Sequence, residues 1–142
     1  PGGVAVSPDG RLVYVTSIAD DQVTVVDTAT NKRVANIDVG DWPLKVAFSP
    51  DGQNAYVVTY SSDAVSVVDV ARGAVTTTIE VGIRPYGLAL SPDGRQAFVT
   101  SQSGNSISVV DLERGESVAT VEVGEHPIGV ASVLAPVETV NA

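Results

Sequence analysis

The residues with the most distinctive chemistry lie in three loops that repeat along the chain. Trp42, Arg84 and His126 occupy equivalent positions, each directly before a proline. An indole, a guanidinium and an imidazole at one position of a constant loop are typical of a binding surface, where a fixed frame presents variable side chains. With the large or charged residues expected on the same face, the predicted ligand-binding set is Trp42, Lys45, Tyr60, Arg84, Tyr86 and His126.

A plainer interpretation exists for each of these loop residues. Trp42 could simply cover a groove between repeats, and for Trp42 and Arg84 this alternative stays open. For His126 an ordinary surface histidine is the preferred interpretation, because its repeat is incomplete. Aromatic and arginine side chains carry much of the contact energy in protein interfaces, and they also stack on sugars. A protein or carbohydrate ligand would therefore suit the set.

Carboxylates also recur along the chain, but their spacing argues against a metal site. Equivalent aspartates lie 42 residues apart and therefore in different repeats. We expect each aspartate to accept hydrogen bonds from N–H groups within its own turn. Asp20 and Asp21 offer oxygens suited to calcium, but too few ligands lie near them. We expect solvated loop residues there and no metal. The residues concerned are Asp9, Asp51 and Asp93, then Asp27, Asp69 and Asp111, and in the loops Asp20, Asp21, Asp63 and Asn105.

Catalytic motifs find little support in the sequence. The chain contains a single histidine and no cysteine, which excludes thiolate chemistry, disulfides and covalent haem attachment. It has no Gly-x-Ser-x-Gly element, zinc-ligand spacing or phosphate-binding glycine loop. We predict no catalytic residues and no cofactor. A non-enzyme is favoured, and the question of activity stays open.

The frame that positions these loops is a repeat of 42 residues. Ser-Pro-Asp-Gly begins at Ser7, Ser49 and Ser91, and the aromatic residues Tyr14, Tyr56 and Phe98 follow in phase. Each copy reads as four short strands rich in β-branched residues and separated by turns. Four strands per unit of this length predict an all-β fold, a β-propeller segment of three four-stranded antiparallel blades plus one extra strand. The three aromatic residues should be buried between blades.

The residues after the Ser-Pro-Asp-Gly turns resemble a known family. Tyr14-Val15-Thr16-Ser17 and its two equivalents resemble the Tyr-Val-Thr-Asn motif of YVTN β-propeller repeats, over residues 1 to about 134. Lys45 departs from the repeat, which has glycine at Gly3, Gly87 and Gly129. The resemblance implies a secreted, periplasmic or cell-surface protein, most often without a defined activity. A looser resemblance to d1-haem proteins and dehydrogenase heavy chains implies, as the alternative, part of a larger cofactor-binding propeller.

The predicted domain organisation is incomplete for a propeller. The blades are expected at residues 1–40, 41–82 and 83–124, the extra strand at 125–134, and a C-terminal tail at 135–142. Because propellers close with typically about four to eight blades, the ring needs either the remaining blades of a longer chain or self-association of two copies. The lack of any methionine and the start inside a repeat favour a piece of a longer chain.

Composition and charge exclude two classes of partner. A net charge of −9 with eight scattered Lys and Arg residues argues against nucleic acid, which requires clustered cations. No apolar run approaches the ~20 residues of a membrane span. No signal peptide is recognisable in this sequence. We therefore expect a non-catalytic binding or scaffold module, placed outside the cytoplasm by the family resemblance alone.

Overall fold

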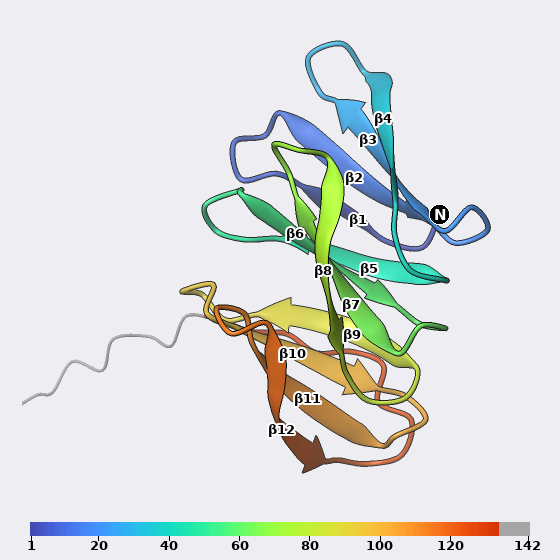
Figure 1. Cartoon of the computed structure of the whole chain (residues 1–142), viewed down its shortest axis with the longest axis vertical. Helices are drawn as coiled ribbons and strands as arrows, with labels where there is room; N and C mark the ends of the chain where they lie inside the picture. The colour runs from blue at the N-terminus through green and yellow to red at the C-terminus, as the bar shows by residue number, and fades with distance from the viewer. Residues whose placement is uncertain (134–142) are drawn as a thin grey trace, which may run out of the picture.

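The computed structural model describes residues 1–133, which form three four-stranded antiparallel sheets stacked along one axis (Figure 1). Within each sheet the strands follow sequence order. No helix occurs in this part of the chain, and accordingly no helix there is long and apolar enough to cross a membrane. The predicted three-bladed propeller segment is confirmed. The strands are β1 Val4–Val6, β2 Leu12–Ser17, β3 Gln22–Asp27 and β4 Lys32–Asp38; β5 Pro43–Phe48, β6 Asn54–Thr59, β7 Ala64–Asp69 and β8 Ala74–Glu80; β9 Pro85–Leu90, β10 Gln96–Ser101, β11 Ser106–Asp111 and β12 Glu116–Glu122.

The Ser-Pro-Asp-Gly segments form the tight turns between the first two strands of each blade. In the second blade, Asp51 Oδ1 accepts hydrogen bonds from Ser49 Oγ at 2.6 Å and from the Gln53 N–H at 2.9 Å. Gly52 takes the left-handed conformation, with φ of 72°, that L side chains rarely adopt. The Ser49 hydroxyl and the Gln53 N–H favour the charged carboxylate and hold the pKa of Asp51 below its ordinary value.

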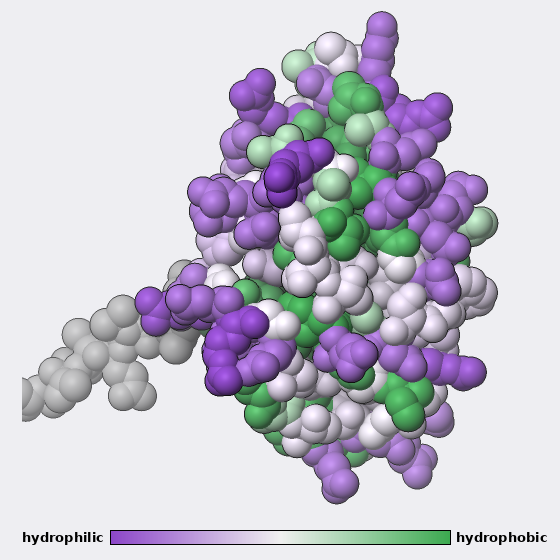
Figure 2. Space-filling view, in the orientation of Figure 1, coloured by the Kyte–Doolittle hydropathy of each residue, from purple (hydrophilic) through white to green (hydrophobic). Residues whose placement is uncertain are grey.

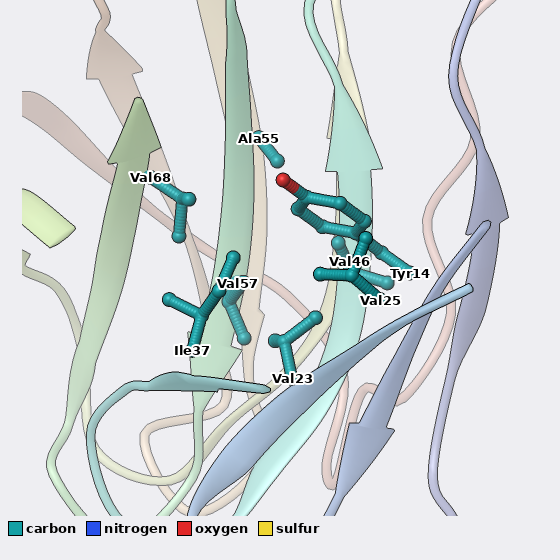
Figure 3. Close-up of a cluster of buried hydrophobic side chains, with 8 residues drawn as sticks. All are labelled: Tyr14, Val23, Val25, Ile37, Val46, Ala55, Val57 and Val68. Atoms are coloured by element: carbon teal, nitrogen blue, oxygen red, sulfur yellow. The ribbon is translucent and has the colours of Figure 1, made fainter. Parts of the chain in front are cut away.

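Two apolar clusters join the blades. Tyr14 is buried in the first, between blades one and two (Figure 3). Its ring lies 4.7 Å from that of Phe48. Tyr56 is buried in the second cluster, between blades two and three. Burial of these two aromatic residues was predicted and is confirmed. Phe98 is only partly buried, because no further blade covers the third sheet.

The burial pattern shows which sheet faces have a neighbour. Nearly every residue of β6 and β7 is buried, since blade two packs against a blade on each side. In β2, β3 and β11 buried residues alternate with partly exposed ones, so blades one and three each leave one face uncovered. Apolar side chains reach the surface there: Val4 is 67% exposed, Val6 57% and Val121 52%. Figure 2 shows apolar patches among the hydrophilic side chains on one side of the molecule.

The structure differs from the sequence prediction after the third blade. Residues 127–133 carry no regular strand, and residues 134–142 lie outside the described part of the chain, so the predicted tail is not described. The Ser132 hydroxyl donates to the Leu90 carbonyl, which places this segment beside β9, as β5 lies beside β1. A strand there requires the second strand of a fourth blade as its ladder partner, and the described chain supplies none.

Candidate functional site

The loops that connect one blade to the next present the variable side chains in an unusual backbone conformation. Trp42, Arg84 and His126 have φ values of 56°, 52° and 53°. Only a few per cent of residues other than glycine lie in this left-handed region, and bulky ones are rarer still. Such a conformation persists only where the surroundings hold it. In Figure 1 the loops from β4 to β5 and from β8 to β9 lie at the same, right-hand ends of the strands.

A repeated pair of hydrogen bonds holds Trp42 and Arg84. The Trp42 N–H donates to Asp21 Oδ1 of the preceding blade at 2.9 Å, and the Trp42 carbonyl accepts from the Tyr60 N–H of its own blade at 3.0 Å. Arg84 is held in the same way by Asp63 Oδ1 at 2.8 Å and by the Gln102 N–H at 2.9 Å. We call this arrangement the inter-blade clamp.

One half of the clamp recurs at His126, whose N–H donates to Asn105 Oδ1 at 3.0 Å. The side chains of Asp21, Asp63 and Asn105 are therefore acceptors for backbone N–H groups of the next loop. The sequence analysis expected solvated loop residues, and the structure shows that these side chains, which make exposed hydrogen bonds, also have a structural role. Sequence alone could not reveal it, since each acceptor lies 21 residues before its donor.

Four of the predicted residues meet in one cluster, which we call the rim cluster: Trp42, Tyr60, Arg84 and Tyr86. The Trp42 and Tyr60 rings stack, with centroids 5.9 Å apart and planes at 27°. Tyr86 meets Tyr60 edge-on at 6.5 Å, and the Arg84 guanidinium lies 5.8 Å from the centre of the Tyr60 ring. Trp42 is still 52% exposed. Aromatic surface is thus preorganised yet open to a ligand.

A pocket of about 310 Å³ opens beside this cluster. It is lined by Leu44 and Gln102 together with Trp42, Tyr60 and Tyr86, and none of these five residues carries a formal charge. Gln102 Oε1 accepts a hydrogen bond from the Tyr60 hydroxyl at 3.0 Å, which joins blade two to blade three. The prediction missed Leu44 and Gln102. Their signal was available, because Gln102 is the repeat equivalent of Tyr60 and Leu44 that of Tyr86.

The remaining two predicted residues lie apart from the rim cluster. Lys45 is exposed and lines a separate pocket of about 450 Å³, which Tyr86 also lines. His126 lies one blade further along and lines neither pocket. The structure therefore connects Lys45 to the site through Tyr86 and does not bring His126 to it.

The strand-end aspartates act as their spacing predicts. Asp27 Oδ1 accepts from the Ala29 and Thr30 N–H groups at 2.8 and 2.9 Å, and Asp111 Oδ1 accepts from the Glu113 and Arg114 N–H groups at 3.0 Å. Within residues 1–133 no group of three or more His, Cys, Asp or Glu side chains could hold a metal ion.

Comparison with solved structures gives close matches to parts of longer chains. Hydrazine synthase from Kuenenia stuttgartiensis is 35% identical, with a TM-score of 0.87 over 91% of this chain and 38% of the other. A functionally unknown protein from Desulfotomaculum acetoxidans DSM 771 is 21% identical, with a TM-score of 0.80 over 90% of this chain and 44% of the other, and it shows the fold alone. The chain thus spans less than half the length of either. No curated protein matches it.

The family comparison matches residues 1–82, which are more than half of the chain, to the family described as lactonase, 7-bladed β-propeller. This match agrees with the three sheets and with the two structural neighbours. The chain belongs to the lactonase family of seven-bladed β-propellers.

Proposed function

We propose that the protein is a non-catalytic binding module of an extracytoplasmic propeller, with a YVTN-type repeat, and that it captures a protein or carbohydrate ligand through the rim cluster. One observation carries the proposal: Trp42, Tyr60, Arg84 and Tyr86 converge from two blades, and the three aromatic residues line a pocket of about 310 Å³. Trp, Tyr and Arg are the residue types enriched among the anchors of protein interfaces. The compartment is inferred from the family resemblance alone.

The physical case for binding is that the cluster is already ordered before a ligand arrives. The inter-blade clamp fixes the backbone of Trp42 and Arg84, and the stacked rings fix Tyr60. Ordering loose side chains costs about 0.5–1.5 kcal/mol each at an interface, and a preorganised cluster avoids much of that loss. The Arg84 guanidinium adds a planar set of donors suited to a carboxylate on the ligand.

The single tryptophan makes the proposal directly testable. Trp42 is the only tryptophan in the chain, so its emission reports the rim cluster alone. We would titrate the protein with a panel of oligosaccharides and acidic peptides. A ligand that covers the exposed indole is expected to shift its emission to shorter wavelength and protect it from acrylamide quenching.

Two variants test whether the rim cluster carries the binding. Arg84→Ala is expected to weaken capture without changing the melting temperature, because Arg84 is exposed and makes no ion pair within residues 1–133. Arg72→Ala is the matched control, since Arg72 is an exposed arginine in the turn between β7 and β8. Unchanged capture by Arg84→Ala and by Trp42→Ala would exclude this surface.

A second candidate is supported by the similarity to hydrazine synthase, which its name identifies as an enzyme. In that case the chain would form part of a larger cofactor-binding propeller. The absorption spectrum and metal content of the protein purified with all of its blades separate the two candidates. A bound chromophore or stoichiometric metal would favour the cofactor-binding propeller over the binding module.

A further inference from the structure

One position of the repeat changes character in the second blade. The first, third and following copies carry Gly3, Gly87 and Gly129, and the second carries Lys45. Steric crowding explains why glycine stands at this position in the first and third copies. A Cβ on Gly87 would lie 2.6 Å from the Ile128 carbonyl oxygen, and a Cβ on Gly3 would overlap the Leu44 carbonyl. A lysine at this position therefore requires a different local arrangement.

The facing strand changes together with it. Gly3 and Gly87 donate their N–H groups to the hydroxyls of Thr16 and Thr100 at 2.6 and 2.8 Å. In the second blade valine stands at the equivalent position, and Lys45 pairs with Val58 in the ladder between β5 and β6. Two departures from the repeat thus occur at one facing pair. Together they place a single cation at the inner edge of the sheets, where β1, β5 and β9 contact one another in turn.

Lys45 lines a pocket whose other walls are mainly apolar. We call it the inner-strand pocket; it has a volume of about 450 Å³ and lies against Tyr86, Leu88, Ile128 and Val130. Its size is within the range of about 300–1,000 Å³ that holds small molecules. The walls come from β5, from β9 and from the segment after blade three, so the pocket depends on the blade packing described above.

The pocket carries a positive charge, whereas the chain as a whole is negatively charged. The net charge is −9, yet no Asp or Glu lines the inner-strand pocket. Within residues 1–133 the only ion pair joins Arg114 to Glu116, so Lys45 has no carboxylate partner in the described structure. Lys45 is exposed beside these apolar walls, so its ammonium can pair with an anion whose apolar part covers them.

We propose that the inner-strand pocket binds a small amphipathic carboxylate. The carboxylate lies at the Lys45 ammonium, and the apolar body packs against Tyr86, Leu88 and Ile128. An anion without an apolar body would leave the apolar walls of the pocket exposed to water. A neutral apolar molecule would leave the Lys45 ammonium without a charged partner. Tyr86 lines both this pocket and the one beside the rim cluster, but the proposal does not depend on the capture of a protein or carbohydrate there.

The experiment compares two probes of the same size, one with a terminal carboxylate and one with an uncharged terminal amide. Isothermal titration of the 142-residue chain with phenylbutyrate is expected to give saturable binding at one site per chain. The neutral phenylbutyramide should bind about tenfold more weakly, the effect of losing one charge-assisted hydrogen bond. Non-specific uptake on the uncovered apolar faces of blades one and three is expected to be similar for the two probes, so the difference between the probes reports the charged site.

Variants assign that difference to Lys45. Lys45→Met and Lys45→Gln should each abolish the preference for the carboxylate, whereas Lys32→Met, at an exposed lysine of β4, should retain it. Trp42→Ala should also retain it, since Trp42 does not line this pocket. Equal affinity for the two probes, no saturable binding of either, or a preference that survives both Lys45 variants would overturn the proposal.

Discussion

Blade packing predicts that two equivalent aromatic residues differ in their importance for stability. Tyr14 is 1% exposed and packs against Phe48 between blades one and two. Replacing it with alanine removes a large buried side chain and leaves a cavity, which is expected to cost about 3–5 kcal/mol. Phe98 holds the same repeat position on the uncovered face of blade three and is partly exposed. Its replacement leaves no enclosed cavity and should cost about 1–2 kcal/mol.

Urea denaturation followed by circular dichroism measures both changes. For a domain with an m-value of about 2 kcal/mol/M, a loss of about 4 kcal/mol in Tyr14→Ala lowers the midpoint by about 2 M. Phe98→Ala should lower it by less than half as much, and Tyr56→Ala should resemble Tyr14→Ala because Tyr56 is also buried between two blades. Equal losses in Tyr14→Ala and Phe98→Ala, measured at low protein concentration, would refute the account of the uncovered face.

The other predictions concern association, acid stability and backbone contacts. Because two sheet faces are uncovered, sedimentation velocity should report species larger than the monomer as concentration rises, and a monomer that persists would contradict this. The pKa of Asp51 is lowered in the folded chain, so its contribution to the free energy of unfolding is present above the ordinary value of 3.8 and is lost as pH falls through the folded pKa; Asp51→Asn should flatten the acid side of the stability curve. Gly87→Ala should destabilise the chain by about 1–3 kcal/mol, whereas Gly129→Ala, with no described atom within 4 Å of its Cβ, should change the melting temperature little.

The fold could be predicted because the sequence of each blade specifies the turns and strands of that blade. Ser-Pro-Asp-Gly specifies a turn whose hydrogen bonds close within five residues, as Ser49 and Asn54 show. Local patterns of this kind do not depend on the rest of the ring. The strand predicted at 125–134 is a different case, because a strand forms only where a partner strand completes its ladder, and residues 127–133 carry no regular strand.

The candidate site was predictable in residue type but not in geometry. Trp42 and Arg84 stand out because they vary within a constant frame. Their contact with Tyr60 depends on how far one blade is rotated from the next, which no local pattern encodes. For His126 the described chain offers no neighbour in the position that Tyr60 and Gln102 occupy for the earlier loops. Its preferred interpretation as a surface histidine is not tested.

The inter-blade clamp explains how such a surface can vary without loss of the fold. The clamp binds only the backbone N–H and carbonyl of Trp42 or Arg84, through the Asp21 or Asp63 carboxylate and the N–H of the residue after the second strand. No bond of the clamp involves the variable side chain itself. An indole and a guanidinium can therefore occupy the same left-handed position, because the same two contacts oppose the conformational strain at Trp42 and Arg84; at His126 the Asn105 contact alone does so. Exchange of the side chain then changes what the face binds while the packing of the blades stays the same.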